Sequence, residues 1–357
     1  MIAFVNIGFA LLLGLSLFAS YIPATNFPIF AIAGLYYPVL LIINLAFILF
    51  WIFVKRKYIL ISLVIILLGF TNLNNTFKLS AASKVSNIDS STFKVLSYNV
   101  RQFQASDKFT RLIVQNDILN FLSEQKAEII CLQEFQSHNK HIYEPLKQIR
   151  DTINSGSYYY ESYYNPRYNY LTGIVTFSKL EAVGKGKLKF EGSRTFGIYT
   201  DFVLGDDTIR VFNMHLASIS LQPNDIDFVI KPEAKDNEQF KSKVGHIYNK
   251  LTEAFILRQK QVELLKEEIL KCPYDIILAG DFNDTPSSYV YNEISNLLND
   301  SFSDKGSGMG ITYAGKIPLL RIDYIFGSNN FTTVNFKKHN ILRSDHYPVS
   351  AIFKTKN

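Results

Sequence analysis

Residues 1–72 form an almost continuous apolar stretch that divides into three runs. Residues 2–22 contain no charged side chain, residues 28–54 are almost wholly apolar, and a shorter run covers residues 58–72. A helix needs about 20 residues to cross the hydrocarbon core, so the first two runs are long enough and the third is marginal without its flanks. A cleavable signal peptide is the alternative for residues 1–20, but no Lys or Arg precedes the apolar segment and two more runs follow it. We therefore predict a membrane anchor of about three transmembrane helices.

The orientation of this anchor follows from one cluster of positive charge, Lys55-Arg56-Lys57, between the second and third runs. Cytoplasmic loops are enriched in Lys and Arg, so we place the cluster in the cytoplasm and the uncharged loop at residues 23–28 outside. Three crossings then predict an integral protein of a bacterial-type inner membrane, with the lipid bilayer as its partner and everything after residue 72 on the extracytoplasmic side. If the third run only lies on the membrane surface, the rest of the chain is cytoplasmic instead.

From residue 93 onward the pattern changes to short β-type runs separated by helical stretches. The preceding segment, residues 73–92, is rich in Asn, Ser, Lys and Ala, has no sustained period and is typical of a linker. Residue type and period predict strands at 93–99, 128–133, 173–178, 201–204, 208–214, 275–279, 322–326 and 349–353, and helices at 109–124 and 254–271. A segment of this length can bury a substantial core and contains no internal repeat. We therefore predict one α/β domain over residues 93–357.

Charge and cysteine content change this picture little. The formal net charge of +6 is modest and dispersed, which favours anionic partners only weakly. The two cysteines, Cys131 and Cys272, are too few for a disulfide framework, and Cys131 lies in an apolar run where a small buried residue is expected. Nothing in the composition implies an obligate protein partner.

Polar residues suited to metal binding or proton transfer occur at the ends of several predicted strands and in the loops beside them. They are Asn99, Glu134, His215, Asp281, Asn283, Asp323, Asp345 and His346. Oxygen ligands of this kind suit Mg²⁺, Mn²⁺ or Ca²⁺ far better than zinc. An imidazole can take a proton from water near neutral pH. Each residue also has an ordinary structural explanation, so its context has to be weighed.

Asp281 and Asn283 follow the apolar strand at residues 275–279. If the extended geometry continues, alternation puts both side chains on the same side, where a carboxylate and an amide could orient water and bind phosphate oxygens. A turn is the alternative, because Asp and Asn favour turns and residues 284–287 read Asp-Thr-Pro-Ser.

The other candidates have comparable alternatives. Asp345 and His346 are adjacent, and neighbouring strand residues point to opposite faces, so both serve one site only from a loop or a strand end. His215 could be a core histidine with satisfied hydrogen bonds. Asp323 could pair with Arg321, or it could orient a histidine as a carboxylate does in hydrolytic triads.

Seven short motifs containing these residues, or lying between them, occur in one order along the chain. They are Leu96-Ser97-Tyr98-Asn99, Cys131-Leu132-Gln133-Glu134, Thr172-Gly173-Ile174-Val175, Asn213-Met214-His215-Leu216, Gly280-Asp281-Phe282-Asn283, Arg321-Ile322-Asp323-Tyr324 and Ser344-Asp345-His346. Together they resemble the endonuclease/exonuclease/phosphatase family, the deoxyribonuclease-I-like superfamily, over about residues 93–354. The resemblance implies a two-sheet α/β sandwich with the site at one end of the packed sheets.

The resemblance also implies a divalent cofactor, Mg²⁺ in the first place, with Mn²⁺ or Ca²⁺ as alternatives. Glu134 would be its principal ligand. Asn99 and Asp345 would support the metal site.

The resemblance assigns catalytic roles in the same way. His346, oriented by Asp323, would be the general base for water. Asp281 would align the nucleophile or assist its deprotonation, and Asn283 and His215 would bind the phosphoryl oxygens. The division of acid and base roles among these residues stays open.

The implied activity is hydrolysis of a phosphodiester in a nucleic acid, a phospholipid or a small molecule, by metal-assisted attack of an activated water. Apurinic-site endonucleases typically carry Asn where this chain has His215, which argues against abasic-site repair. Two alternatives remain: a phosphomonoesterase of the inositol-phosphatase type, and a non-catalytic membrane scaffold that retains the fold.

Three features outside the motifs have two interpretations each. The tyrosines between residues 158 and 170 indicate a β hairpin rather than a base-stacking or lipid-facing cluster. Residues 218–252 indicate a solvated insertion rather than a helical cover at the site entrance. Arg258 either faces the site or pairs with Glu263 and its neighbours.

Overall fold

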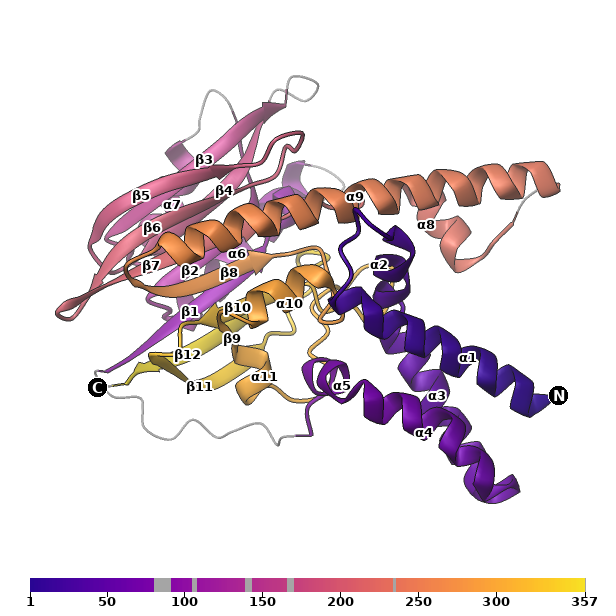
Figure 1. Ribbon diagram of the computed structural model, residues 1–357. Helices are drawn as coiled ribbons and strands as arrows, with labels where there is room; N and C mark the ends of the chain where they lie inside the picture. Colours follow the sequence, from indigo (N-terminus) through magenta and orange to yellow (C-terminus); the bar gives the residue numbers. More distant parts are fainter. Residues whose placement is uncertain (80–90, 105–107, 139–142, 166–169, 234–235, 357) are drawn as a thin grey trace.

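The computed structural model describes residues 1–79, 91–104, 108–138, 143–165, 170–233 and 236–356. The linker expected at residues 73–92 lies largely outside the described residues, because 80–90 are not among them. A bundle of apolar helices at the N-terminus packs against one end of an α/β sandwich (Figure 1).

The N-terminal bundle consists of α1 (Ile2–Leu17), α2 (Pro28–Leu35), α3 (Tyr37–Val54), α4 (Ile59–Leu68) and α5 (Phe70–Thr76). Two segments, Ile2–Ser20 and Tyr37–Val54, are long and apolar enough to cross a membrane. The segment Arg56–Leu68 with Phe70–Thr76 makes a third only if its 75° bend lies within one span. The apolar run at 28–54 is therefore not one helix. It divides at Tyr36, and Pro38 lies in the first turn of α3, where the missing N–H of proline is tolerated.

Polar side chains inside the bundle bond to one another. Asn6 donates to the Ser62 hydroxyl at 2.7 Å, and Ser62 donates to Asn44 Oδ1 at 2.8 Å. The Trp51 indole donates to Asn6 Oδ1 at 2.9 Å, which closes the network. Buried polar groups are costly without hydrogen-bond partners, so this network constrains how α1, α3 and α4 pack.

The sandwich contains two six-stranded mixed sheets. The first has the order β11 (Phe331–Lys338), β12 (Val349–Thr355), β1 (Thr92–Asn99), β2 (Ile129–His138), β4 (Tyr170–Ser178), β3 (Ser157–Asn165). The second has the order β5 (Ala182–Lys189), β6 (Phe196–Leu204), β7 (Asp207–His215), β8 (Asp275–Asp281), β10 (Asp323–Gly327), β9 (Asn299–Asp300). Each sheet holds one parallel pair, β1 with β2 and β7 with β8, beside antiparallel pairs. The predicted two-sheet α/β sandwich is confirmed.

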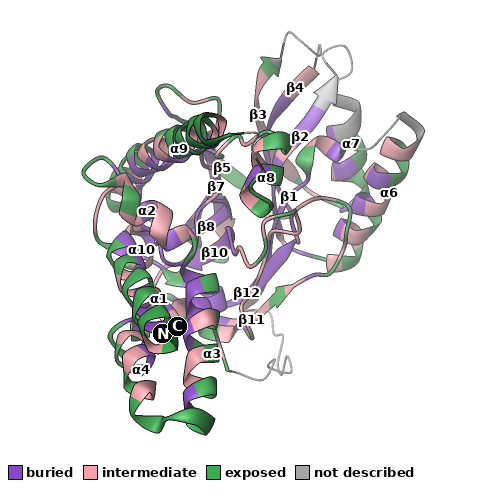
Figure 2. Cartoon of the chain, turned by 90° about the vertical axis from the view of Figure 1, so that its right-hand side faces the viewer, coloured by how far each residue is buried: buried purple, intermediate pink, exposed green. Residues whose placement is uncertain are grey.

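The core forms because strand residues alternate between the two faces of each sheet. Val95, Cys131, Val211, Ile277 and Val349, all fully buried, lie between the sheets. The outer face of the first sheet is covered by α6 (Lys108–Gln125) and α7 (Tyr143–Thr152). The outer face of the second is covered by α9 (Asn237–Lys271) and α10 (Tyr289–Ser295), and Figure 2 shows buried strands between helices with exposed outer faces. Two short helices, α8 (Pro223–Ile230) and α11 (Ser301–Lys305), complete the domain.

The tyrosine-rich segment is the β hairpin that the sequence favours. The edge strand β3 pairs in antiparallel register with β4 along its whole length. Tyr158 and Tyr160 pack against the core on one face, whereas Tyr159 and Tyr163 pack against Ile198 and its neighbours on the other. Packing therefore accounts for these aromatic rings.

The helical bundle is bonded to the sandwich as well as joined to it in sequence. The Thr25 backbone N–H donates to the side chain of Gln259 on α9 at 3.0 Å, and the Gln259 amide donates back to the Thr25 hydroxyl at 3.1 Å. Arg321 donates to the carbonyl of Asn75 at 2.9 Å. At Gly34 a Cβ would lie 2.4 Å from the Ala19 Cβ and 3.0 Å from the Ser287 carbonyl, so only glycine permits this approach.

Candidate active site

The candidate residues come together because the strands that carry them end at the same edge of the sandwich. Asn99 ends β1, and His215 and Asp281 end the parallel strands β7 and β8 as register partners. Asp323 begins β10 opposite Asp281 in antiparallel register. Residues far apart in sequence therefore share one end of the two sheets.

Glu134 reaches the site through an irregularity in its strand. The pairing of β2 with β4 shifts register between Leu132 and Phe135, and Glu134 has a positive φ of 51°. A bulge of this kind redirects a side chain and is common beside active sites. Positive φ is unusual for a residue with a Cβ, so the surrounding pairing must hold Glu134 in place.

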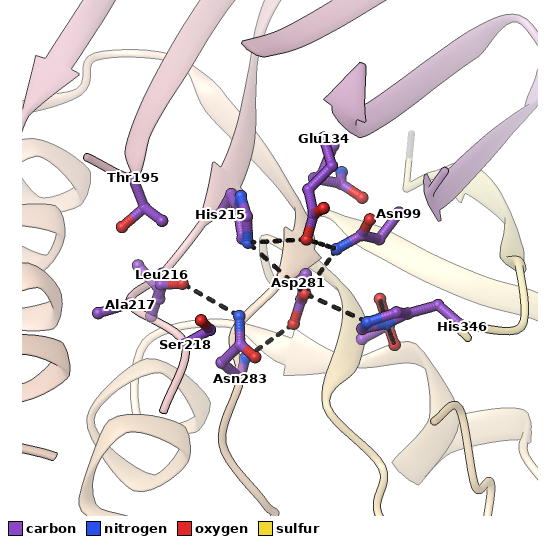
Figure 3. Close-up of polar contacts among 12 residues, drawn as sticks. Asn99, Glu134, Thr195, His215, Leu216, Ala217, Ser218, Asp281, Asn283 and His346 are labelled. Carbon is purple, nitrogen blue, oxygen red and sulfur yellow. Dashed lines mark hydrogen bonds and ion pairs between the residues drawn. The ribbon is translucent and has the colours of Figure 1, made fainter. Parts of the chain in front are cut away.

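Asn99 connects two of the carboxylates. Its amide nitrogen lies 2.9 Å from Asp281 Oδ2 and 3.1 Å from Glu134 Oε1, and its oxygen accepts from the Arg101 backbone N–H at 2.9 Å. Figure 3 shows the amide between the two acids. Asn99 thus fixes the spacing of two negative charges that would otherwise repel each other.

His346 and Asp323 form a buried pair. The imidazole Nδ1 lies 2.9 Å from Asp323 Oδ2 and 3.1 Å from Oδ1, while Nε2 points toward Asp281 Oδ2 at 3.7 Å. Burial disfavours the charged ring, but the negative charges of Asp323 and Asp281 outweigh it and raise the pKa of His346. Burial raises the pKa of Asp323, although His346 acts in the opposite direction. Of the two partners considered for Asp323, the structure selects His346, since Arg321 pairs with Asp300 at 2.8 Å.

His215 is aimed at the carboxylates without bonding to them. Its Nε2 lies 3.8 Å from Glu134 Oε1 and 3.8 Å from Asp281 Oδ2. This nitrogen is buried and has no hydrogen-bond partner among the described residues. A buried polar atom without a partner is costly, which marks a place for an oxygen of a bound molecule.

Asn283 lies in a turn rather than on a continued strand. Its φ is 52°, and its backbone N–H donates to Asp281 Oδ1 at 2.9 Å. Its amide donates to the Leu216 carbonyl at 3.1 Å. Asn283 therefore lies in a turn and also beside the site, whereas the sequence presented a turn and a place in the site as alternatives.

Asp345 stands at the rim, where its side chain is 21% exposed and Arg101 Nε lies 3.2 Å away. Burial raises the pKa of Asp345, and Glu134 raises it further, while His346 and Arg101 oppose the shift. Ser344 holds this loop in place by donating to the Asn99 carbonyl at 2.8 Å.

These side chains surround a cavity of about 220 Å³. Glu134, Asp281, Asn283, Asp345 and His346 line it. Asn99, His215 and Asp323 contact the lining residues through the bonds and approaches described above. The structure thus brings all eight sequence candidates together.

The donor set fits a hard divalent cation. Within the described part of the chain, the residues lining the cavity include three carboxylates and no Lys or Arg. Such a cluster of oxygen donors suits Mg²⁺, Mn²⁺ or Ca²⁺. Ligating atoms of Asp281, Asp323 and His346 also lie within 4.8 Å of one another. In that trio His346 Nδ1 is already bonded to Asp323, whereas Glu134 and Asp345 line the cavity with more exposed oxygens.

The sequence left two roles open for Arg258, and it did not identify Asp284, the partner that Arg258 has in the structure. Arg258, fully buried, donates to Asp284 at 3.0 Å and to the Ala217 carbonyl at 2.8 Å. It thereby connects the segment after His215 with the segment after Asp281, and it does not pair with Glu263. Asp284, which follows Asn283 directly, was the available signal for this pair, but no neighbouring residue indicated that its partner is Arg258.

The fold and the site define a phosphoester-hydrolase type of sandwich, and comparison with known proteins assigns the family. The model of the Endonuclease/Exonuclease/phosphatase family matches residues 96–346, more than half of the chain. The chain belongs to this family, whose members are divalent-metal-dependent phosphoester hydrolases acting on substrates such as nucleic acids. A second model, a domain of unknown function (DUF8431), matches residues 1–76. No curated protein matches the chain.

Solved structures share the sandwich at low sequence identity. An endonuclease/exonuclease/phosphatase from Beutenbergia cavernae has a TM-score of 0.54 at 16% identity, covering 74% of this chain and 72% of that one. A family protein from Bacteroides vulgatus has a TM-score of 0.52 at 14% identity, covering 74% and 99%. The human Nocturnin catalytic domain has a TM-score of 0.51 at 15% identity, covering 76% and 96%. At this identity the likeness concerns the fold alone.

Proposed function

We propose that this protein is a membrane-anchored, divalent-metal-dependent phosphodiesterase that hydrolyses its substrate with an activated water. The observation that carries the proposal is the cavity described above, which is lined by three carboxylates and by His346 of the buried His-Asp pair. The His215 nitrogen, which has no hydrogen-bond partner among the described residues, lies 3.8 Å from two of these carboxylates.

Each residue has a task in the proposed reaction. His346 accepts a proton from the attacking water at Nε2, and Asp323 stabilises the resulting imidazolium. Asp281, which lies beside Nε2, aligns the water for attack on phosphorus. His215 and the Asn283 amide bind the non-bridging phosphoryl oxygens, whose negative charge grows in the transition state.

Glu134 and Asp345 would hold the divalent cation. Asn99 would keep Glu134 in position through its amide nitrogen, and the Asn99 side-chain oxygen would support the metal site. A cation bound there would supply positive charge, which would favour the neutral form of His346 before the reaction and stabilise the leaving oxygen. As the new P–O bond forms, the P–O bond to the leaving group breaks, and that oxygen takes up a proton. The products are a phosphomonoester and an alcohol.

The placement of the bundle supports an extracytoplasmic site in a bacterial-type inner membrane. The sandwich contacts the loop and helix between α1 and α3, at Thr25 and Gly34. The cluster Lys55-Arg56-Lys57 lies at the opposite end of α3. If the cluster is cytoplasmic, as the positive-inside rule predicts, the sandwich is outside.

Hydrolysis of bis(p-nitrophenyl) phosphate by the full-length protein in detergent tests the proposal. We expect turnover with Mg²⁺, loss with EDTA, and at least a hundredfold loss of kcat in Glu134→Ala and His346→Ala. The matched controls are Glu268→Ala and His246→Ala, which change exposed residues of the same types on α9. Preference for p-nitrophenyl phosphate would favour the phosphomonoesterase alternative. Activity that survives both site substitutions, or no activity at all, would refute the proposal, the latter in favour of a scaffold.

A further inference from the structure

The entrance of the cavity is apolar although its floor is acidic. Beyond the carboxylates and His346, the walls include half-buried aliphatic residues from four separate segments. They are Leu35, Ile219, Leu221, Ile226, Ile317 and Leu320. A polyanion such as a nucleic acid is bound by Lys and Arg along its phosphates. Three cations that contact or adjoin lining residues are already paired: Arg101 with Asp345 at 3.2 Å, Lys316 with Asp227 at 2.5 Å and Lys250 with Asp225 at 2.7 Å.

One wall belongs to the membrane anchor. Leu35 is the last residue of α2, and Ala31 and Ile32 of the same helix pack with Ile219 and Leu221 in one apolar cluster. The cavity is therefore incomplete without the anchor. An anchor that only localised the enzyme would have no reason to form part of the site.

The segment around α2 has the composition of a membrane–water interface. Phe18, Tyr21, Phe27 and Tyr36 are between 42% and 62% exposed, and Phe27 and Phe18 contact Phe30. Exposed aromatic side chains at the end of a membrane span mark the headgroup level. Since Leu35 lies between Phe27 and Tyr36 in sequence, the cavity entrance lies at that level.

The start of α9 and the helix α8 project on the same side of the sandwich as the bundle, as Figures 1 and 2 show. Ile230, Phe240, Val244 and Tyr248 are exposed there, interspersed with exposed lysines such as Lys241. Apolar residues that alternate with Lys are typical of a helix resting in the headgroup region. Within the segment 218–252, which the sequence indicated as a solvated insertion, residues 218–221 and Ile226 line the cavity.

From these observations we infer that the substrate is a phospholipid, which reaches the site from the bilayer with its phosphoester on the carboxylate floor and its glyceryl and acyl carbons along the Leu35 wall. The inference rests on the proposed phosphodiesterase function. A cavity of about 220 Å³ holds a phosphorylated headgroup but not the acyl chains, which stay in the membrane. Water adds to phosphorus, one ester P–O bond breaks, and the released oxygen takes a proton, giving an alcohol and a phosphomonoester.

The test compares two substrates with the full-length protein reconstituted into vesicles of phosphatidylethanolamine and phosphatidylglycerol. Lipid products are separated by mass spectrometry, and bis(p-nitrophenyl) phosphate reports the chemistry independently. We expect Mg²⁺-dependent loss of phospholipid. Leu35→Asp and Ile226→Asp, both in the cavity lining, should each lower the ratio of lipid hydrolysis to small-ester hydrolysis at least tenfold. Leu264→Asp is the control, since Leu264 is an exposed aliphatic residue of α9 that does not line the cavity.

A second measurement does not depend on turnover. A phospholipid with a photoreactive group near its glyceryl carbons, irradiated in EDTA, should label peptides that contain Leu35 or residues 219–226. Small-ester hydrolysis without lipid hydrolysis, faster cleavage of plasmid DNA, or labelling confined to α1 and α3 would overturn the lipid assignment and leave the phosphodiesterase intact. Loss of both activities would refute the proposed function itself.

Discussion

Arg258→Met should destabilise the sandwich severely, because it leaves a buried carboxylate without its counter-ion. Arg258 is fully buried, Asp284 is 3% exposed, and Nε lies 3.0 Å from Asp284 Oδ2. Breaking such a pair by removing one partner costs about 3–5 kcal/mol. Methionine keeps much of the volume, so cavity formation adds little. A loss of that size lowers the melting temperature by roughly 6–20 °C, since a large domain loses about 2–4 °C per kcal/mol.

The pH dependence of the variant distinguishes this cause from simple loss of packing. Burial already raises the pKa of Asp284, and Arg258 is the main influence that lowers it. Without Arg258 the folded protein holds Asp284 protonated at a pH where the unfolded chain has released the proton. The folded state then binds more protons, so the free energy of unfolding of Arg258→Met should fall as pH rises from 5 to 8 relative to wild type.

Thermal unfolding of the full-length protein in detergent, followed by circular dichroism, measures both effects. The double variant Arg258→Met/Asp284→Asn should recover most of the stability, since no buried charge remains. A single variant within about 1 kcal/mol of wild type, or one equally destabilised at pH 5 and pH 8, would refute the reasoning. Arg258 also bonds to the Ala217 carbonyl, so we expect kcat to fall in parallel.

Three further predictions concern separate parts of the sandwich. Asp323→Asn keeps the shape of the side chain that bonds to His346 but removes its charge. The kcat for bis(p-nitrophenyl) phosphate should therefore fall by about 10²–10⁴-fold with little change in KM. A fall of less than tenfold would contradict the assigned pair. Burial, aided by Lys94 and Lys337, lowers the pKa of His339 to about 3, so below pH 6.5 the unfolded chain binds a proton that the folded chain does not. The free energy of unfolding of wild type should therefore fall by up to about 1.4 kcal/mol per pH unit as pH drops below 6.5. His339→Gln should lack that slope in urea unfolding at pH 7.5 and 5.0, and equal slopes would exclude His339 as its source. Gly280→Ala should not yield folded protein, because φ is +147° and a Cβ would lie 2.0 Å from the Met214 carbonyl oxygen. Gly245→Ala, on α9 with open space around it and no positive φ, should fold and melt within a few degrees of wild type.

Local periodicity predicted the strands beside which the candidate site residues lie, but not the strands β5 and β11, the helices α7, α8 and α10, or the first half of α9. The buried runs before Asn99, Glu134 and Asp281 predict strands because alternation and apolar content are local properties, and parallel neighbours must then end at a common edge. The apolar runs at the N-terminus likewise predict membrane-spanning helices from length alone. In these cases the information lies within about 20 neighbouring residues.

Contacts between distant residues decided everything else. Whether Asp323 bonds to Arg321 or to His346 depends on how β10 sits against the loop before β12, and the sequence offered both. Glu134 reaches the site through a bulge against β4, which has no local signal. Leu35 joins the cavity wall across more than 180 residues from Ile219, because tertiary packing brings α2 against α8 and α9. The sequence thus determined the elements that local periodicity predicts and the chemical groups of the candidate site, since both follow from neighbouring residues. Only the tertiary structure decided which partners those groups have and which residues form the apolar entrance, because both depend on the packing of distant segments.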